Sequence, residues 1–201
     1  REQTLRDTAA LLPGPWAALP CDMADTTAAA VLAAQTVSAT GGLDVLVNNA
    51  AVALPALISE ATPRDIDAMF AANGAGPVAL ISAAWPHLEH AALSHGRASI
   101  VNISSMATLD PFPNLYAYAA SKAALNVAAL AAHNAGRATG IRAFSLAPGA
   151  VETQMLRAVV TEHEIPASRT LRPETIAAVV LECVRGDRDA QSGQTIPILS
   201  P

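Results

Sequence analysis

The chain alternates between short apolar runs and longer segments whose apolar residues recur at helical spacing. The longer segments predict helices at 1–13, 26–40, 63–70, 114–138 and 173–185. A further segment, from residue 77 to about 90, forms either a separate helix or the rest of a longer kinked one. The short runs predict strands at 16–21, 43–47, 98–103, 141–146 and 195–199. Strands that alternate with helices form a parallel sheet with helices on both faces, so the pattern predicts one doubly wound α/β domain in three layers over 1–201.

Local signals place several helix ends. Asp25 is a plausible N-cap for the helix at 26–40, and Gly41-Gly42 ends it. Pro13-Gly14 ends the first helix, while Pro173 opens the last and Gly186 closes it. The region 152–171 mixes apolar and charged residues and fits no element, so we interpret it as a flexible lid with a helical piece.

Composition narrows the class of protein. The chain has 201 residues, of which 52% are hydrophobic and only 3% aromatic, which favours a folded core with closely packed, alanine-rich helices. Its net charge of −5 is scattered without a basic stripe, so we expect no nucleic-acid partner. No uninterrupted apolar run approaches the ~18 residues of a membrane span, so we expect no membrane partner. Cys21 and Cys183 are isolated in sequence, which favours a reduced, cytoplasmic protein, although one disulfide between them stays possible.

The chemistry-bearing stretch is 98–122. Tyr118 and Lys122 are four residues apart and share one face of a predicted helix. An ammonium near a phenol favours the phenolate, so we expect Lys122 to lower the pKa of Tyr118 and make it an acid/base group for a carbonyl and its alcohol. Ser105 follows a predicted strand, at the sheet edge where ligands bind, and could hydrogen-bond the carbonyl oxygen.

In these residues the chain resembles the short-chain dehydrogenase/reductase family, in its compact single-domain branch. The matching segments run in order along the whole chain: Asp22 after a strand, Leu-Val-Asn-Asn-Ala at 46–50, Asn73, Ile-Val-Asn-Ile-Ser-Ser at 100–105, Tyr118-Ala-Ala-Ser-Lys122 and Pro148-Gly149-Ala-Val-Glu-Thr153. The resemblance implies a Rossmann-like fold and an NAD(P)-dependent oxidoreductase that interconverts a ketone and a secondary alcohol. It implies that Tyr118 is the general acid/base, that Ser105 orients the substrate and that Asn73 holds a water in a proton relay to Lys122.

The resemblance also implies where a cofactor lies. Lys122, beside Tyr118, would hold the nicotinamide ribose. The other expected cofactor-binding residues are Asp22 and Met23 at the adenine, Asn48 and Ala50 beside the adenosine, and Pro148, Gly149, Val151 and Thr153 at the nicotinamide. Arg1, as the possible end of a basic segment, gives NADP a slight preference over NAD.

The chain departs from the family pattern at two places. Ala51 stands where a glycine is usual, which slightly narrows the approach to the backbone. The glycine-rich phosphate loop, with its strand, helix and following strand, is expected before Arg1 and is absent from this chain. We therefore expect ~40–50 further residues upstream, about one strand–helix–strand unit; the alternative is a fragment or a degenerate member that cannot bind the pyrophosphate.

The predicted substrate pocket lies between the loop 106–115 and the lid. Its expected lining is apolar and favours a moderately apolar ketone or alcohol, with Ser105 as the polar contact: Met106, Phe112, Met155 and Leu156. Arg157 and Arg169 could bind a substrate carboxylate or be surface charges, and His163 could touch substrate. The histidines at 87, 90 and 95 lack a completing ligand set, so we expect no metal.

Two further expectations concern assembly and function. The alanine-rich helix at 114–138 and the family likeness favour a homo-dimer or homo-tetramer. A non-catalytic cofactor-sensing or binding protein on the same fold is the main alternative function, and a dehydration or epimerisation with the same tyrosine is a weaker one.

Overall fold

The fold is built on a four-stranded parallel sheet. The computed structural model describes residues 2–12 and 16–201 of the chain. The strands are β1 (Val45–Asn48), β2 (Ala98–Ile103), β3 (Ile141–Pro148) and β4 (Thr195–Ile198), in the order β1-β2-β3-β4. The register pairs Asn48 with Asn102, Ile103 with Leu146, and Pro148 with Ile198. The four β-branched, apolar runs at 43–47, 98–103, 141–146 and 195–199 are thus confirmed as strands, with small shifts at their ends.

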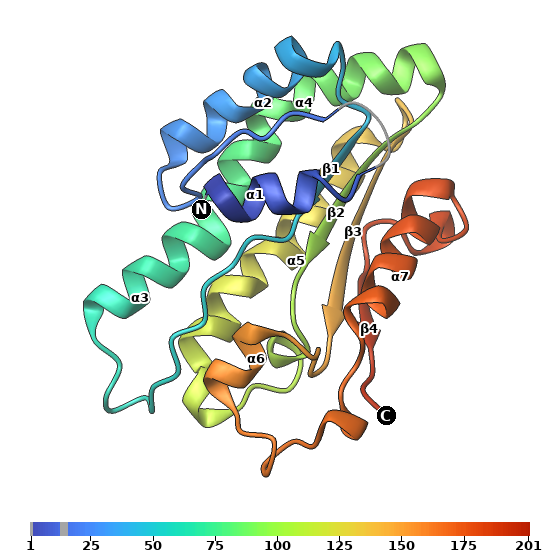
Figure 1. Cartoon of the computed structure of the whole chain (residues 1–201). Coiled ribbons are helices and arrows are strands. Elements are labelled where there is room, and N and C mark those ends of the chain that lie inside the picture. Colours follow the sequence, from blue (N-terminus) through green and yellow to red (C-terminus); the bar gives the residue numbers. More distant parts are fainter. Residues whose placement is uncertain (1, 13–15) are drawn as a thin grey trace.

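Helices cover both faces of this sheet (Figure 1). On one face α4 (Gly76–His95) and α5 (Tyr116–Gly136) contact the strands, and α2 (Thr26–Thr40) packs on α4. This face buries Ile100, Ala143 and Leu88 in a cluster dominated by alanine. On the other face α7 (Pro173–Arg185) packs against Val101 and Phe144. The predicted three-layer α/β/α architecture is therefore confirmed.

The predicted helix ends at Asp25, Gly41, Pro173 and Gly186 are confirmed. The Asp25 carboxylate accepts hydrogen bonds from the main-chain N–H groups of residues 27 and 28, which have no partner within the helix. Gly41 and Gly186 end α2 and α7 in the left-handed region, with φ of 87° and 101°. Pro173 occupies the first turn of α7, where a missing N–H costs nothing.

A single helical run spans Pro63–His95. It consists of α3 (Pro63–Phe70), a π-helical turn (Ala71–Ala75) and α4, so the longer kinked helix is the correct one of the two alternatives. By length and composition alone the run could cross a membrane, although no uninterrupted apolar stretch reaches that length. Buried residues of α4 such as Ala84 and Leu88 belong to the core cluster, so packing against α2 and the sheet accounts for the apolar character of the run.

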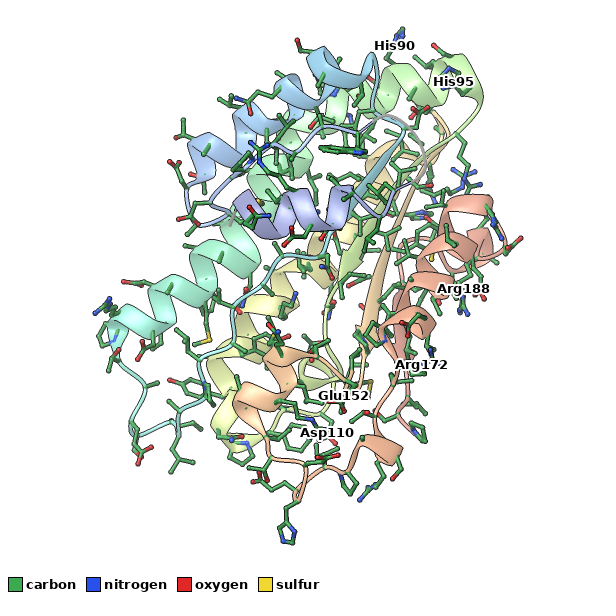
Figure 2. The ribbon with its side chains drawn as sticks, in the orientation of Figure 1. His90, His95, Asp110, Glu152, Arg172 and Arg188 are labelled. Atoms are coloured by element: carbon green, nitrogen blue, oxygen red, sulfur yellow. The ribbon has the colours of Figure 1, made fainter. Side chains whose placement is uncertain are left out.

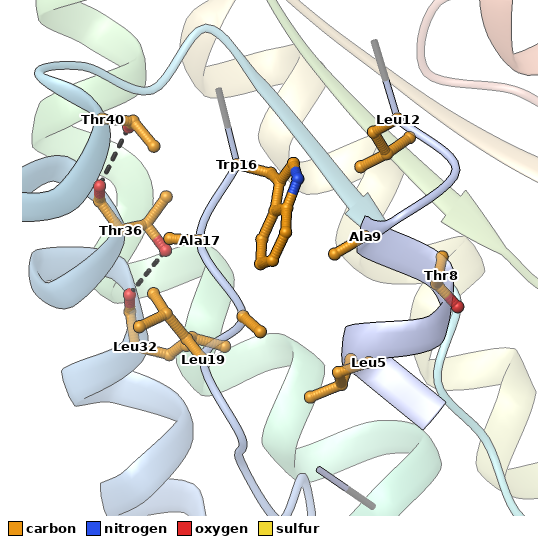
Figure 3. A pocket seen from close by; sticks show the side chains of 11 residues that line it. Leu5, Thr8, Ala9, Leu12, Trp16, Ala17, Leu19, Leu32, Thr36 and Thr40 are labelled. Carbon is orange, nitrogen blue, oxygen red and sulfur yellow. Dashed lines mark hydrogen bonds between the residues drawn. The ribbon is translucent and has the colours of Figure 1, made fainter. Parts of the chain in front are cut away.

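The predicted strand at 16–21 is wrong. Residues 16–20 have no regular secondary structure, and residues 16–19 line an apolar cavity together with Leu5 of α1 (Glu2–Ala9) and Leu32 of α2 (Figure 3). A strand needs a neighbouring backbone to pair with, and this segment lies between two helices instead. The first helix ends at Ala9, while the predicted stop at Pro13-Gly14 lies outside the described residues.

The segment after β3 contains the short helix α6 (Gln154–Val159) and a 3-10 turn (Ala167–Arg169). An isolated parallel bridge pairs Val151 with Leu171 and closes the segment at its base. In Figure 1 the segment lies below the carboxyl ends of β2 and β3. The expected helical piece is therefore present, and the segment is positioned over one edge of the sheet.

Candidate functional site

The predicted site residues gather at the carboxyl edge of the sheet. Asn48 ends β1, Ser105 follows β2 by two residues, and Pro148 ends β3. Since the strands are parallel and adjacent, their carboxyl ends lie side by side. The sheet thus brings together three segments that are separated by about 50 residues each in the sequence.

Ser105 is held by the turn that follows it. Its backbone is extended, with φ of −160° and ψ of 148°, and its side chain caps the 3-10 helix Met106–Thr108. The Ser105 Oγ accepts a hydrogen bond of 3.1 Å from the main-chain N–H of Ala107. The Ser105 side chain also interacts with the Tyr118 phenol and lowers its pKa, so the serine lies near the phenol, as the predicted catalytic pair requires.

Lys122 lies one turn after Tyr118 on α5 and is almost entirely enclosed. Its side chain is 2% exposed, and its Nζ donates to the main-chain carbonyl oxygen of Ile103 at 2.5 Å. Burial disfavours the charged ammonium and lowers the pKa of Lys122 from 10.5 to about 8. The site therefore keeps a desolvated amine one helical turn after Tyr118.

The expected lowering of the Tyr118 pKa by Lys122 is not found. Burial raises the pKa of Tyr118 above its ordinary value of 10.0, and the interaction with Ser105 offsets only part of that rise. In this structure the phenol is thus a protonated hydrogen-bond donor at neutral pH. Sequence reasoning overlooked this because it considered the charge on the neighbouring residue and not the loss of water around the phenol.

Asn73 lies in the π-helical turn and is fully buried. Its Oδ1 accepts from the Val52 N–H at 2.8 Å, and its Nδ2 donates to the Val52 carbonyl at 2.8 Å and to the Ser121 Oγ at 2.9 Å. The Ser121 hydroxyl donates in turn to the Tyr118 carbonyl at 2.8 Å. The Asn73 side chain therefore ties the loop after β1 to the helix turn that carries Tyr118.

Two chains of hydrogen-bonded polar side chains near the site were missed from the sequence. In the first, Asn48 Nδ2 donates to Asn102 Oδ1 at 2.9 Å, and Asn102 Nδ2 donates to the Leu125 carbonyl at 3.0 Å. In the second, Asn126 connects Ser145 on β3 to Thr108, three residues after Ser105. A spacing signal was available for Asn126, because it is four residues after Lys122 and so lies on the same helix face.

The residues expected at the adenosine side differ in how far their side chains are exposed to solvent. Asp22 is exposed, and its Oδ1 accepts from the Ala24 N–H. Met23 is partly buried and packs against the core cluster. Asn48 is only 5% exposed and its amide is bonded to Asn102, so its side chain is not directed to solvent, whereas Ala50 is exposed.

The residues expected at the nicotinamide form a continuous turn after β3. The Gly149 N–H donates to the Ile198 carbonyl at 2.9 Å, and a Cβ on Gly149 would lie 2.5 Å from the Ser200 Oγ. Val151 takes part in the bridge to Leu171. Thr153 caps α6 through its Oγ1, which accepts from the Leu156 N–H at 3.2 Å. The backbone of this turn is thus fixed by β4 on one side and by α6 on the other.

The predicted apolar lining comes from the segments on both sides of this edge. Phe112 and Met155 are 57% and 39% exposed, while Met106 and Leu156 are partly buried. A third segment was missed: the loop after β1 exposes Leu54 and Leu57, and it is joined to the turn before α5 by a hydrogen bond between Ala56 N and Asn114 O.

Arg157 is engaged within the segment 152–171. Its guanidinium forms two hydrogen bonds with the Glu152 carboxylate and donates to the Ile165 carbonyl at 2.8 Å. Glu152 also accepts from the Thr170 hydroxyl at 3.0 Å. Arg157 therefore stabilises the fold of this segment, whereas Arg169 and His163 are exposed.

The histidines form no metal centre with other side chains. His95 pairs with Asp44 at 2.6 Å, and His90 and His95 lie at the far end of the molecule from Glu152 (Figure 2). Within residues 2–12 and 16–201, no group of three or more His, Cys, Asp or Glu side chains could hold a metal ion.

Comparisons with known proteins identify relatives of this chain. Residues 1–164 match the model of the short chain dehydrogenase family. The chain is 32% identical over 166 residues to a 3-oxoacyl-[acyl-carrier-protein] reductase of Thermotoga maritima, which covers 79% of this chain and 65% of that protein. It is 30% identical over 161 residues to an L-xylulose reductase of Caenorhabditis elegans, which covers 76% of this chain and 63% of that protein. The chain thus spans a little under two thirds of the length of these relatives.

A solved structure gives the same fold. A 3-ketoacyl-(acyl-carrier-protein) reductase of Brucella melitensis, complexed with NADH, superposes with a TM-score of 0.89 at 22% identity. The match covers 98% of this chain and 82% of that one. Because the family model matches most of the sequence, this chain belongs to the short-chain dehydrogenase/reductase family.

Proposed function

We propose that the protein is an NAD(P)-dependent oxidoreductase that interconverts a ketone and a secondary alcohol, with Tyr118 as general acid/base. The observation that carries this proposal is the placement of three groups: Ser105 lies near enough to Tyr118 to lower its pKa, and the buried Lys122 lies one helical turn after Tyr118 on α5. A phenol, a hydroxyl and an ammonium that converge at a sheet edge suit the protonation and orientation of a carbonyl oxygen. Family membership supports the same activity.

The roles follow from what each group can donate. The Ser105 hydroxyl hydrogen-bonds the substrate carbonyl oxygen and orients it. The Tyr118 phenol, which is protonated at neutral pH and whose pKa is raised further by burial, delivers its proton to that oxygen in the direction of reduction. A nicotinamide cofactor, when bound at this edge, would supply the hydride that the carbonyl carbon needs. In the direction of oxidation Tyr118 accepts the alcohol proton and must first be ionised.

The buried lysine fits a nicotinamide ribose. An ammonium has three N–H donors, and the described part of the chain accounts for one of them, the bond to the Ile103 carbonyl. The remaining donors suit a vicinal diol. Tyr118, Pro148, Gly149, Val151 and Thr153 complete the nicotinamide side, and Asp22, Met23, Asn48 and Ala50 the adenosine side. NAD and NADP both stay candidates, with NADP slightly favoured.

We propose that Asn73 acts in proton relay through its main chain. Its side-chain amide already donates both hydrogens, to Val52 and to Ser121. Pro77, four residues later, has no N–H and cannot make the usual helical bond to the Asn73 carbonyl. That carbonyl is the atom best suited to hold a water leading to Lys122.

The substrate class is a small, moderately apolar ketone or alcohol. Met106, Phe112, Met155 and Leu156 supply apolar surface, and the segment 152–171 serves as a lid over it. The relatives named above act on carbonyl compounds, by their printed names a 3-oxoacyl chain and L-xylulose, which supports the reaction type and leaves the substrate open.

We further propose a cytoplasmic, single-domain homo-dimer or homo-tetramer. Cys21 and Cys183 are both free thiols, which suits a reducing compartment. Val127 and Leu130 are 67% and 48% exposed on one face of α5, and a second copy would bury them.

The deciding experiment compares the wild-type chain with Tyr118→Phe. NADH and NADPH oxidation is followed with ethyl acetoacetate, acetophenone and cyclohexanone as probes, and cofactor binding is followed by fluorescence. We expect turnover of at least one ketone by the wild type and a loss of about 100-fold or more in kcat in Tyr118→Phe. Equal turnover by both would refute the role of Tyr118. Cofactor binding without turnover of any ketone would favour the non-catalytic cofactor-sensing protein.

A further inference from the structure

We propose that Asn126 and Thr108 are positioning residues, which hold Ser105 in place through a hydrogen-bonded chain anchored at Ser145 on β3. The inference rests on the proposed function, because it assigns these residues a task in the geometry of the same site. We assign neither side chain a contact with the substrate or the cofactor. Their effect on catalysis passes through the serine.

The chain consists of three consecutive hydrogen bonds. The Ser145 hydroxyl donates to Asn126 Oδ1 at 2.6 Å, and Asn126 Nδ2 donates to Thr108 Oγ1 at 3.0 Å. The Thr108 hydroxyl donates to the Ser105 carbonyl at 2.7 Å. Each hydroxyl has a single hydrogen, so once Thr108 donates to Ser105, its oxygen can only accept from Asn126. This fixes the orientation of the Asn126 side-chain amide, with Nδ2 toward Thr108. The amide oxygen Oδ1 then faces Ser145 and accepts its hydroxyl hydrogen.

The chain begins at a rigid point of the fold. Ser145 is fully buried in β3, between β2 and β4. Asn126 and Thr108 are partly buried, so their bonds are shielded from exchange with water. These hydrogen bonds therefore fix the start of the loop after β2 relative to the central strand β3.

At its other end the chain acts on Ser105 itself. The Ser105 carbonyl receives both the Thr108 hydroxyl and the Thr108 N–H, at 2.7 and 3.0 Å, while the Ser105 Oγ receives the Ala107 N–H. The serine is thus held at its carbonyl and at its hydroxyl by one short turn. If the turn shifts, the hydroxyl leaves its alignment with Tyr118.

Helix α5 carries both the predicted acid/base pair and Asn126. Tyr118, Lys122 and Asn126 are spaced by four residues on α5, and so lie on one face of it. A movement of α5 therefore carries the acid/base pair and the clamp on Ser105 together. The distance between the Tyr118 phenol and Ser105 is therefore preserved when α5 moves. Without these hydrogen bonds, the loop that carries Ser105 would not follow the helix.

The test uses Thr108→Val, which removes the hydroxyl and keeps the shape, and Asn126→Ala. Thr108→Ser is the conservative rescue. Thr139→Val is the matched control, because the Thr139 hydroxyl also donates to a carbonyl three residues earlier, at 2.9 Å, and is also partly buried, but lies before β3 and away from the site. Circular dichroism and thermal unfolding identify any variant that fails to fold.

The first readout needs neither cofactor nor substrate. The chain has two tyrosines, so tyrosine labelled with ¹³C at the ring Cζ gives two resonances, and Tyr118→Phe assigns them. At neutral pH the Tyr118 resonance is expected to move in Thr108→Val and Asn126→Ala toward its position in Ser105→Ala. It should stay in place in Thr108→Ser and Thr139→Val. A folded Thr108→Val whose Tyr118 resonance coincides with that of the wild type would overturn the proposal.

The second readout is kinetic, with the best ketone probe. We expect kcat to fall about tenfold in Thr108→Val and Asn126→Ala while KM for the cofactor stays within about twofold, and Thr108→Ser to recover most of the loss. An equal loss in Thr139→Val would overturn the proposal, because the effect would then be general destabilisation. If the wild type turns over no ketone, the proposed function fails, while the resonance experiment still decides whether Asn126 and Thr108 hold Ser105.

Discussion

The Nζ of Lys122 donates to the main-chain carbonyl oxygen of Ile103 at 2.5 Å, from a side chain that is 2% exposed. This bond joins the first turns of α5 to the end of β2, and so fixes the helix that carries Tyr118 against the strand that leads to Ser105. The enclosure has a cost, because it disfavours the ammonium and lowers the Lys122 pKa to about 8.

Lys122→Met should make the protein more stable at pH 7 while abolishing turnover. The fall in pKa from 10.5 to about 8 corresponds to roughly 3 kcal/mol, and the lost bond to Ile103 offsets about 1 kcal/mol of the gain. In the wild type the unfolded state holds its proton between pH 8 and 10.5 and the native state does not, so wild-type stability rises with pH in this window. The difference in stability between Lys122→Met and the wild type should therefore decrease as the pH rises from 8 to 10.5.

Chemical denaturation at pH 7 and pH 10 measures both effects. A variant that is less stable than the wild type at pH 7 would show that the bond to Ile103 outweighs the desolvation of the amine.

The Tyr118 phenol should titrate above pH 10.0 in the cofactor-free protein, because burial raises its pKa more than the interaction with Ser105 lowers it. Subtracting the tyrosinate absorbance of Tyr118→Phe from that of the wild type isolates this group, since the chain has two tyrosines. A midpoint below 10.0 would contradict the raised Tyr118 pKa. The same shift predicts that alcohol oxidation, which needs the phenolate, increases with pH throughout the alkaline range.

Arg157→Met should loosen the segment 152–171, because it removes the two bonds to Glu152 and the bond to the Ile165 carbonyl. We expect KM for the ketone to rise about three- to tenfold with kcat nearly unchanged, together with faster proteolysis within the segment. Arg169→Met, at an exposed arginine of the same segment, is the control. Identical kinetics and cleavage in the two variants would contradict a stabilising role for Arg157.

Gly76→Ala should destabilise the protein although alanine is the better helix former. A Cβ at this position would lie 1.8 Å from the Met23 carbonyl oxygen, so the backbone of one segment must move. We expect a loss of roughly 2–4 kcal/mol in the free energy of unfolding. Gly42→Ala, with no atom within 4 Å of its added Cβ, serves as the control, and similar stability of the two variants would show that the close approach is easily relieved.

Val127→Glu should reduce the oligomeric mass measured by sedimentation, because it places a charge in the face of α5 that we assign to subunit contact. Val31→Glu, at a similarly exposed valine on α2, should leave the mass unchanged. An unaltered mass in Val127→Glu would move the contact away from this face.

The sequence predicted most of the fold because the relevant signals are local. β-branched runs identified the four strands, and Asp25, Gly41, Pro173 and Gly186 identified helix ends through groups that act within one turn. The strand at 16–21 failed for the complementary reason: an apolar run can line a cavity between two helices as well as pair with a strand.

For the site, spacing predicted which residues meet but not how their environment alters them. Tyr118 and Lys122 were found from their separation of four residues, whereas the rise in the Tyr118 pKa depends on burial by distant segments. Asn126 and Thr108 were overlooked because each belongs to a different element, and only the fold brings them into contact with Ser145.

The π-helical turn at residues 71–75 inserts one extra residue into the run Pro63–His95. One residue corresponds to about 100° of rotation in an α-helix, so α3 and α4 are out of phase and no single helical wheel describes both. Deleting one residue within the turn would restore a regular helix, yet it would turn Asn73 away from Val52 or rotate α3 against the rest of the domain. The π-helical turn thus rotates α3 relative to α4. As a result, one continuous helix can pack α4 into the core and direct Asn73, at its middle, toward the site.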